Sequence, residues 1–516
     1  MPSSSGAGLT AIAALLVSVV VYVRRSRRDS CPLPPGPRKL PLIGNVLDIP
    51  ASKEWDQCMR WAKQYDTDIL HLDLCGQSII VLDTYESCIE LLEKRSSKYS
   101  GRPDQPTIVN LMGWEFNFAI MPYGARRHKM FHFRPNSATS DLHPSMTKAT
   151  HIFLRRLLDA QVLDFETELR HMAGRIITDI AYGIEVEPHD DPYVATAKAA
   201  IHCLSTGATI GMYVASKIPA LMYLPDWIPG AHFRRDAEVS RNLSRVLLDK
   251  PFELVKRRMA DGTAKASFAS MALQKADDGV TAAYEDDTIK NTAGTMIMGG
   301  SDTTVCALLN FTLAMLAHPD VQERAQAELD DVLKPGQLPD FGDEERLPYV
   351  TAIVKESLRY MPVTPGGLPH YYTGDTPDIF HGYTIPEGSV VVANIWSMVH
   401  DETAYPDSYS FKPERFLTGH GKLDPTVRDP VDIVFGFGRR ICPGRYMAYS
   451  SVWITVASLL SVYTIAKASR PDGSIIEVEP EYVPGVVPMP KAFSCKFVAR
   501  NRETERVLRE TENWEQ

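Results

Sequence analysis

One long apolar segment, from Lys290 to Pro319, constrains the fold of this chain more than any other feature. At about 1.5 Å per residue, a helix of that length would cross an entire domain. The segment lacks the flanking charge asymmetry of a membrane span, and the polar residues Asp302, Thr303 and Thr304 interrupt it. We therefore predict a buried central helix that ends near Pro319, because proline cannot continue a helix.

Helical patterns dominate the rest of the body, and strand patterns are few. Amphipathic helices are predicted for His318 to Leu333 and for Leu347 to Pro362. A β-hairpin is predicted for His71 to Asp83, and two short strands around a Pro-Glu-Gly turn for Gly382 to Asn394. No shift in composition divides residues 46–516. The expected fold is therefore mainly α with a small β subdomain, in a single domain.

The N-terminus has the pattern of a membrane anchor. Residues 1–23 carry no charge, Gly8 to Val23 is strongly apolar, and the basic cluster Arg24 to Arg28 follows directly. Basic residues stay on the cytosolic side, so residues 1–30 are expected to form a single transmembrane anchor with the body in the cytosol. A cleaved signal peptide is the alternative, but its charged end would precede the apolar run. The prolines of residues 31–45 predict a stiff, extended hinge or a plain linker.

Charge and cysteine usage exclude two classes of protein. The net charge of the 516-residue chain is −9, and no long basic stretch follows the first forty residues, so no nucleic-acid partner is expected. The eight cysteines are scattered and contain no C-x-x-C pair, which argues against a zinc ribbon or a disulfide scaffold. Most of them are expected to be buried as small apolar residues in a reducing compartment.

One cysteine, Cys442, lies in a loop that differs from the surroundings of the others. The loop reads FGFGRRICPGRYMA, and its glycines permit backbone conformations that a side chain would forbid. A helical pattern follows Pro443, and a helix N-terminus facing the sulfur would lower the pKa of the thiol. Gly444 would let a flat group approach the backbone, and Arg440 would neutralise an anion. The loop therefore predicts a thiolate ligand for a flat, anionic, metal-bearing group, and haem fits this description.

The same loop resembles a known family signature. Phe435, Gly438, Arg440, Cys442 and Gly444 match F-x-x-G-x-R-x-C-x-G, the haem-thiolate signature of the cytochrome P-450 monooxygenases. The resemblance covers residues 30–516 and is greatest to fungal secondary-metabolism members, relatives of O-methylsterigmatocystin oxidoreductase in mushrooms. It implies the cytochrome P-450 fold, haem b as cofactor, and Cys442 as the axial ligand whose thiolate favours O–O cleavage.

The resemblance also implies partners and a location. O₂ and a small lipophilic substrate, such as a terpenoid or polyketide, would meet at the haem. The chain has no plausible dinucleotide fingerprint, so electrons would come from NADPH through a separate NADPH–cytochrome P-450 reductase, with Arg439 and Arg445 as candidate contacts. The anchor would hold the haem-thiolate catalytic domain, residues 46–516, on the cytosolic face of the endoplasmic reticulum membrane.

Two further motifs follow in the order that the family shows. Glu356 and Arg359 lie three residues apart on a predicted helix, a spacing that lets them pair, and Arg415 lies in the later P-E-R-F motif. The resemblance implies that these three residues form a buried ionic triad that braces the haem face. The same spacing at Glu503 and Arg506 predicts only a solvated pair.

The predicted central helix contains GGSDTT, which resembles the family motif A/G-G-x-D/E-T-T. Asp302 and Thr303 place an acid beside a hydroxyl, a pair that can relay the two protons that O–O cleavage requires. A threonine that bonds back to its own helix is the alternative, and both readings can hold at once. Gly299 costs the helix about 1 kcal/mol relative to alanine, which a closely approaching ligand or helix packing would explain.

The remaining site residues follow from the resemblance alone. His370 is expected near a haem propionate. The family motif W-x-x-x-R is absent from Met121 to Phe133, where Arg126 or Arg127 would replace it at a propionate. The substrate chamber is expected to be lined by Trp114, Phe116, Gly299, Val363, Gly367, Leu368 and Val486.

The predicted function is a haem-thiolate monooxygenase that hydroxylates or otherwise oxidises an intermediate of fungal secondary metabolism. Two alternatives remain open. The first is a haem-dependent isomerase or dehydratase of the same fold, although such enzymes often lack the acid–hydroxyl pair. The second is a degenerate haem-binding relative without activity.

Overall fold

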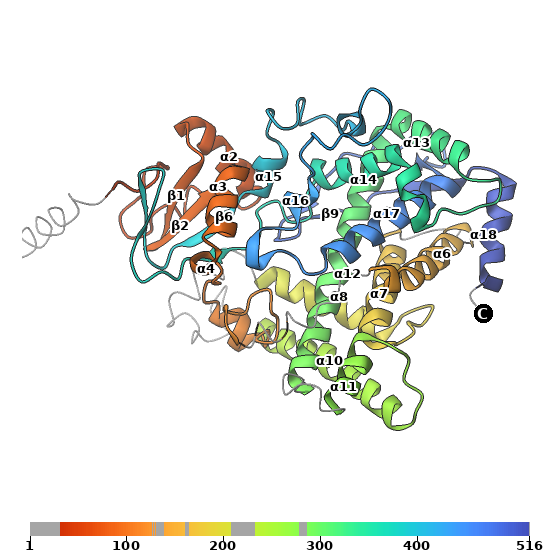
Figure 1. The fold of residues 1–516 in the computed structure, drawn as a ribbon, viewed down its shortest axis with the longest axis horizontal. Coiled ribbons are helices and arrows are strands. Elements are labelled where there is room, and N and C mark those ends of the chain that lie inside the picture. Colours follow the sequence, from red (N-terminus) through yellow and green to blue (C-terminus); the bar gives the residue numbers. More distant parts are fainter. Residues whose placement is uncertain are drawn as a thin grey trace, which may run out of the picture.

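The long helix α12 (Asp286–Ala317) runs through the centre of a helix-rich body, with a small sheet at one end (Figure 1). The computed structural model describes residues 31–125, 127, 130, 139–159, 165–207, 233–277 and 286–514. The predicted anchor, residues 1–30, lies outside the described residues, so its placement stays a prediction. The mainly α fold with a minor β part is as predicted.

Helix α12 is most deeply packed along its C-terminal half, where every residue from Thr304 to Leu316 is buried. Among the described helices, α12 alone is long and apolar enough to cross a membrane, and 72 % of its most apolar window is buried inside the protein. A helix that is apolar all round belongs in the core of a large protein when other helices cover it. The predicted buried central helix is thus confirmed.

Other helices surround α12, and α7 (Phe165–Tyr182) and α17 (Arg445–Val462) are prominent among them. The predicted helices at 318–333 and 347–362 are present as α13 (Pro319–Val332) and α14 (Pro348–Tyr360). The remaining α-helices are α2 (Glu54–Tyr65), α3 (Tyr85–Cys88), α4 (Ser96–Tyr99), α6 (His143–Asp159), α8 (Pro192–Gly207), α10 (Phe233–Ala260), α11 (Phe268–Asp277), α15 (Ile395–Val399), α16 (Val431–Val434) and α18 (Arg502–Trp514). Short turns are η1 (Ile89–Lys94), η2 (Thr107–Leu111), η3 (Thr139–Leu142), η5 (Phe341–Arg346), η6 (Pro413–Phe416) and η7 (Gly438–Arg440).

The largest sheet has the strand order β1-β2-β6-β3. The predicted hairpin is confirmed, because β1 (Ile69–Leu74) pairs antiparallel with β2 (Gln77–Leu82). Strand β6 (Val390–Ala393) runs parallel to β2, and β3 (His370–Tyr371) pairs antiparallel with β6. The two-stranded sheets pair β4 (Asp378–Phe380) with β5 (Tyr383–Ile385), β7 (Tyr463–Lys467) with β10 (Cys495–Ala499), and β8 (Tyr482–Val483) with β9 (Met489–Pro490). The two strands predicted in 382–394 are β5 and β6, and they belong to different sheets.

Core packing joins the cysteine-bearing part of the chain to the central helix. The main apolar cluster combines buried side chains of α6, α7, α12, α14 and α17, including Trp453, which is fully buried. The indole N–H of Trp453 donates to the Thr351 hydroxyl at 3.0 Å, so α17 is fixed to α14 by a polar contact as well as by apolar area. The loop before α17 therefore projects from a rigid base.

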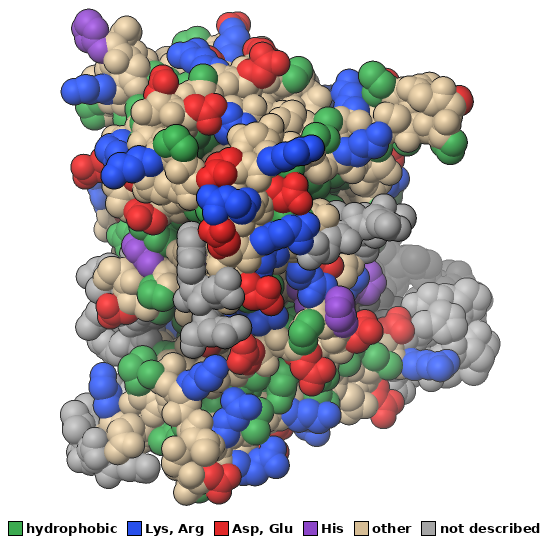
Figure 2. All heavy atoms as spheres, turned by 90° about the vertical axis from the view of Figure 1, so that its right-hand side faces the viewer, with side chains coloured by type: hydrophobic (Ala, Val, Ile, Leu, Met, Phe, Trp, Pro, Cys, Tyr) green, Lys and Arg blue, Asp and Glu red, His purple; other side chains and the backbone are tan. Residues whose placement is uncertain are grey.

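The surface that carries α18 has intermingled acidic and basic side chains (Figure 2). Helix α18 itself contributes three exposed ion pairs of Arg506 and Arg509 with glutamates on its own turns. Apolar side chains are scattered over this face. Such a mixed surface generates no large field of a single sign.

Candidate functional site

The cysteine loop is shaped by a close backbone approach. It runs from α16 through the turn η7 to α17, and the Cys442 N–H donates to the Phe435 carbonyl at 2.8 Å. Gly438 has a φ of +56°, and a Cβ at this position would lie 2.0 Å from the Leu92 carbonyl oxygen of η1. Any side chain there would therefore clash with the backbone, which explains why the turn needs glycine.

The sulfur of Cys442 faces the backbone of the next helix start. Helix α17 begins at Arg445 with Gly444 as its N-cap, so Pro443 precedes the helix instead of occupying its first turn. A Cβ built on Gly444 would meet the Cys442 Sγ at 4.0 Å and no nearer atom. The space beside the sulfur therefore stays open because residue 444 has no side chain.

The pKa of the Cys442 thiol is raised, which corrects the expectation from the sequence. Burial raises this pKa, while the Gly444 N–H and the charge of Arg445 act against burial without reversing it. The prediction of a net lowering was wrong because desolvation outweighs one helix N-terminus. Ligation does not require a low pKa in the free chain, because a thiol that coordinates a metal is deprotonated outright.

Three arginines and a histidine converge next to the cysteine loop. Arg440 and Arg127 are buried, Arg102 is partly buried, and the ring of His370 is buried beside them. Burial and the mutual repulsion of these charges lower the pKa of Arg102 to about 9 and that of Arg440 to about 8. Burial and the same arginines lower the pKa of His370 to about 3, so its ring is neutral. We call these four residues the arginine cluster.

The arginine cluster is held by carbonyl oxygens. Arg102 donates to the carbonyls of Ala119, Leu368 and Pro369, and Arg440 to those of Ser100, Phe118 and Met121. Arg127 donates to the carbonyl of Arg439 at 2.9 Å, and His370 Nδ1 lies 2.8 Å from the carbonyl of Tyr99. In the described part of the chain, neither Arg102 nor Arg440 forms an ion pair with a carboxylate.

Desolvated positive charge on Arg102 and Arg440, with no carboxylate partner among the described residues, fits an anionic ligand. Haem carries two propionates, so the residues present fit the group that the cysteine loop predicts. Of the two arginines proposed to replace W-x-x-x-R, Arg127 lies in the cluster, and Arg126 lies outside the described residues. Arg102 was missed by sequence reasoning, because nothing in the surrounding SGRPDQ marks it as a site residue.

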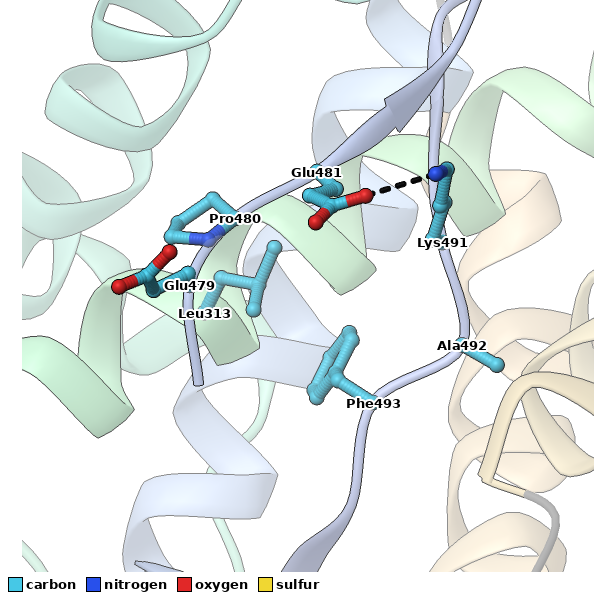
Figure 3. A pocket seen from close by; sticks show the side chains of 7 residues that line it. All are labelled: Leu313, Glu479, Pro480, Glu481, Lys491, Ala492 and Phe493. Atoms are coloured by element: carbon cyan, nitrogen blue, oxygen red, sulfur yellow. Dashed lines mark hydrogen bonds and ion pairs between the residues drawn. The ribbon is translucent and has the colours of Figure 1, made fainter. Parts of the chain in front are cut away.

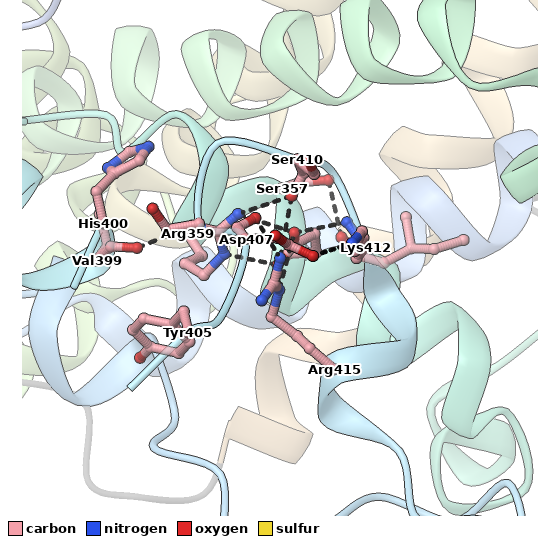
Figure 4. Close-up of polar contacts among 12 residues, drawn as sticks. Ser357, Arg359, Val399, His400, Tyr405, Asp407, Ser410, Lys412 and Arg415 are labelled. Carbon is pink, nitrogen blue, oxygen red and sulfur yellow. Dashed lines mark hydrogen bonds and ion pairs between the residues drawn. The ribbon is translucent and has the colours of Figure 1, made fainter. Parts of the chain in front are cut away.

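Arg359 and Arg415 lie close together (Figure 4), and both form ion pairs with the buried Glu356. Arg359 Nε and Nη2 donate to the two oxygens of Glu356 at 2.7 and 2.9 Å. Arg415 Nε lies 3.1 and 3.2 Å from the same oxygens, and the Lys412 N–H donates to Oε1 at 2.7 Å. The side chains of Glu356 and Arg359 have no exposed surface.

The triad also ties the loops after α15 to helix α14. Arg359 donates to the carbonyls of Val399 and Ser410, and Arg415 to those of Pro406, Asp407 and Ser410. Two cations therefore share one carboxylate, and their remaining N–H groups bond to the backbone. This network crosslinks α14 to the chain that leads to the cysteine loop.

Asp302 forms an ion pair with Arg170 of α7 at 2.5 Å. Burial raises the pKa of Asp302, while the charge of Arg170 acts in the opposite direction. A hollow of about 10 Å³ beside the pair is lined by α7, α8 and α12, including Lys198 and Ser301. Arg170 was not predicted, since its link to Asp302 spans 132 residues and its nearer partner, Glu166, suggests an ordinary surface pair.

The hydroxyl of Thr303 donates to the Gly299 carbonyl at 2.6 Å. This is the bond back to the helix that the sequence left as one alternative. A Cβ built on Gly299 would meet no atom within 4 Å, so α12 borders open space at this turn. The acid and the hydroxyl thus have different partners, Arg170 for Asp302 and the Gly299 carbonyl for Thr303.

The residues expected to line a substrate chamber fall into two groups. Trp114 and Phe116 are 0 and 3 % exposed and stack on each other, and the Trp114 indole donates to Ser240 of α10 at 3.0 Å. Both side chains pack in the core of the described structure, and their role in lining a substrate chamber stays a prediction. The second group is open to solvent in whole or in part and consists of Gly299, Val363, Gly367, Leu368 and Val486. Gly367 has a φ of +63°, and a Cβ there would lie 2.6 Å from the Ala393 carbonyl oxygen.

A separate hollow of about 230 Å³ lies where α12 meets the C-terminal strands (Figure 3). Leu313 and Phe493 face it, and the ion pair of Glu481 with Lys491 at 2.7 Å spans one side. Its rim is charged and exposed, and the cysteine loop does not contribute to it. This hollow is therefore distinct from the candidate site.

The chain is similar to known proteins along almost its whole length. Residues 34–497 match the family model described as cytochrome P-450. The chain is 41 % identical to cytochrome P-450 monooxygenase 98 of Postia placenta over 98 % of this chain and 97 % of that protein. It is 39 % identical to cytochrome P-450 monooxygenase ple1 of Rhodocybe pseudopiperita, over 96 and 94 % of the two chains. It is 38 % identical to tryptamine 4-monooxygenase of Psilocybe cyanescens, over 95 and 98 %.

Proposed function

Because the chain belongs to the cytochrome P-450 family, whose cofactor is haem with a cysteine thiolate, we propose that this monooxygenase oxidises a small lipophilic intermediate of fungal secondary metabolism. Terpenoids and polyketides are the substrate classes that we favour. The observation that carries the proposal is the open sulfur of Cys442 beside Arg102 and Arg440, for which the described residues provide no carboxylate partner.

The chain's own residues have separate tasks in this reaction. Cys442 would ligate the iron, and Arg102, Arg127 and Arg440 would hold the propionates. Haem with a thiolate ligand supplies the reductive activation of O₂ and the transfer of one oxygen atom. Gly444 and Gly299 keep side chains out of the space beside the sulfur and beside α12.

Asp302 and Thr303 would relay the protons that the reaction requires. The hollow next to Asp302 has room for about one water molecule, so the carboxyl can exchange a proton with solvent when its contact with Arg170 opens. The Thr303 hydroxyl uses its proton in the bond to Gly299, which leaves its oxygen lone pairs free to accept a bond from water. In this scheme the Asp302 carboxyl exchanges a proton once it parts from Arg170, and the Thr303 oxygen accepts a hydrogen bond from water.

Electron supply and location complete the proposal. Two electrons from NADPH would arrive through a separate reductase, which would dock near the exposed Arg439 and the partly exposed Arg445 at the cysteine loop. Residues 1–30 would anchor the chain in the endoplasmic reticulum membrane with residues 46–516 in the cytosol, joined by the hinge 31–45. The basic cluster Arg24 to Arg28 supports this orientation.

Reconstitution with a fungal reductase tests the function. We expect the reduced CO complex to show the red-shifted Soret band of thiolate-ligated haem, and we expect O₂ uptake that needs NADPH and a substrate. The panel should combine terpenoids and polyketides with tryptamine, which a relative's name identifies as that relative's substrate. Turnover without NADPH or O₂ would indicate an isomerase or dehydratase, and failure to take up haem would indicate a degenerate relative.

A further inference from the structure

The buried half of helix α12 carries two polar side chains whose hydrogen bonds reach other segments of the chain. Cys306 and Asn310 are 0 and 5 % exposed. A polar group in such surroundings is unfavourable unless it is hydrogen-bonded, and an apolar side chain would fill the same space without this cost. Thr312, by contrast, donates to the Leu308 carbonyl of its own helix at 2.8 Å. The partners of Cys306 and Asn310 outside α12 should therefore explain why these two residues are polar.

Asn310 binds the end of helix α14. Its Nδ2 donates to the Met361 carbonyl at 3.2 Å, while its Oδ1 meets no donor among the described residues. Met361 is the C-cap of α14, so its carbonyl belongs to the last turn, where carbonyls lack partners within the helix. Pro362 follows and cannot continue the helix. Asn310 thus fixes the point at which the chain leaves α14.

Cys306 binds the segment that joins β8 to β9. Its Sγ lies 3.6 Å from the Pro488 carbonyl oxygen, a position that suits a weak S–H···O bond. Burial raises the pKa of the Cys306 thiol to about 12, so the sulfur keeps the proton that this bond requires. The amide of Asn310 also donates to this sulfur, at 3.7 Å. The donors therefore follow one direction, from Asn310 to Cys306 and from Cys306 to Pro488.

The two segments that these bonds reach are predicted to line the substrate chamber. Val363 lies two residues after Met361, and Val486 lies two residues before Pro488. Helix α12 contacts both α14 and β9. The position of each lining side chain therefore follows from a carbonyl that α12 holds two residues away.

The same face of α12 leads to the glycine turn of the site. Gly299, Thr303, Cys306 and Asn310 are spaced by four, three and four positions, and residues with such spacing lie above one another on a helix. Gly299 borders open space at one end of this row, and Asn310 reaches the end of α14 at the other. One row of side chains thus connects the open turn with both lining segments.

We propose that Asn310 and Cys306 are positioning residues that set the shape of the substrate chamber by holding residues 361–368 and 484–490 against α12. The inference rests on the proposed function, because it takes these two segments as walls of the chamber. Neither side chain touches the substrate in this scheme. Both act through the carbonyls of Met361 and Pro488, so they determine which molecules fit and not how the oxygen atom is transferred.

Hydrogen exchange on the full chain in detergent tests whether the bonds hold the two segments. Asn310→Leu keeps the size of the side chain and removes its donors. The matched control is Thr312→Val, which also replaces a buried polar side chain of α12 but breaks only a bond within the helix. We expect amide exchange in residues 359–368 and 481–491 to become about fivefold faster in Asn310→Leu and to stay unchanged in Thr312→Val. Unchanged exchange in Asn310→Leu, or equal increases in both variants, would overturn the proposal.

The affinity for two imidazoles tests the effect on the chamber. Imidazole and 4-phenylimidazole both bind haem iron through a ring nitrogen and shift the Soret band, but only the phenyl group extends to the walls. We expect Asn310→Leu to weaken the binding of 4-phenylimidazole about fivefold relative to imidazole, and Thr312→Val to leave this ratio unchanged. Faster exchange with an unchanged ratio would mean that Asn310 supports only the fold, which would overturn the proposal.

Cys306 provides a second and milder test. Cys306→Ala removes the bond to Pro488 and should speed exchange in residues 481–491 but not in residues 359–368. Cys306→Ser keeps a donor at the same position and should retain the exchange of the parent chain. If Cys306→Ser behaved as Cys306→Ala does, the volume of the sulfur and not its proton would hold the segment, which would overturn the proposed bond.

Failure of the proposed function would be recognised separately. A parent chain that takes up haem but oxidises no compound of the substrate panel would refute the proposed function, while the exchange rates and the affinity ratio would still decide the role of Asn310. A parent chain that takes up no haem would refute the proposed function and this inference together.

Discussion

The ionic triad and the arginine cluster both contain desolvated arginines, but the charges of these arginines are compensated in different ways. In the triad, Arg359 and Arg415 share the Glu356 carboxylate and give their other N–H groups to carbonyls. In the arginine cluster, Arg102 and Arg440 meet carbonyls and each other's charge, and their pKa values fall below the usual arginine range.

The difference shows which group is complete within the chain. A buried charge is tolerated when an opposite charge and hydrogen bonds compensate for the hydration that it has lost. The triad meets this condition with protein atoms alone, so its role is to crosslink the fold. Among the described residues no carboxylate meets it for Arg102 and Arg440, so we propose that these two arginines bind an anion. Changes in the triad should therefore act on stability, and changes in the cluster should act on haem affinity.

The largest effect on stability is expected for Glu356→Gln. The variant leaves two buried arginines without a counter-charge, which should lower the free energy of unfolding by about 3–5 kcal/mol. Urea unfolding measures the loss. The control is Glu503→Gln, which breaks an exposed pair of the same spacing with Arg506 and should cost less than about 1 kcal/mol. Equal losses of unfolding free energy in Glu356→Gln and Glu503→Gln would contradict the assignment of the triad to stability.

A smaller effect of a different kind is expected for Arg440→Gln. Removal of one propionate contact should weaken haem binding by about 1.5–3 kcal/mol, or roughly ten- to 150-fold. The unfolding of the haem-free chain should change less than in Glu356→Gln, because the lost carbonyl bonds are offset by relief of repulsion. Haem titration and urea unfolding measure the two quantities. A lower free energy of unfolding with unchanged haem affinity would mean that Arg440 supports the fold, as the triad does, and does not bind haem.

Arg127→Gln decides how the chain compensates for the missing W-x-x-x-R motif. We expect haem affinity to fall by about 1 kcal/mol, roughly fivefold, because Arg127 belongs to the cluster. Arg126→Gln is the matched comparison, since the sequence offers both residues. The assignment fails if Arg126→Gln weakens haem binding and Arg127→Gln does not.

At neutral pH the smallest effect is that of His370, because its contribution changes only as the solution is acidified. Its pKa is about 3 in the folded chain and 6.5 in the unfolded chain, so the unfolded state binds one more proton between these values. The free energy of unfolding should therefore fall as pH falls through this window, by up to about 1.4 kcal/mol per pH unit. Urea unfolding at several pH values should show a shallower slope in His370→Asn. Identical slopes would mean that the ring is not held neutral by the arginine cluster.

The sequence predicted the parts of the site that depend on short spacing. The cysteine loop, the pair Glu356 and Arg359, and the central helix all lie within single segments, where glycine, helical periodicity and three-residue spacing have direct structural meaning. Arg415 was placed correctly because the order of motifs in the family was matched, not because its spacing required it.

The parts that the sequence did not predict depend on tertiary contacts. Arg102 and Arg170 reach their partners across long stretches of chain, and their local sequences look like ordinary surface segments. The pKa of Cys442 was predicted in the wrong direction because burial cannot be read from a loop motif. The burial of Trp114 and Phe116 was not predicted either, because an aromatic segment suits a chamber wall and a core equally well.

The central claim is that the Cys442 sulfur ligates haem iron, and Cys442→Ser tests it most directly. The reduced CO spectrum should be recorded for the variant and the parent chain after haem loading. We expect the parent to show the red-shifted thiolate band and the variant to lose that band together with NADPH-dependent oxidation. A variant that keeps the band and full turnover would contradict this account.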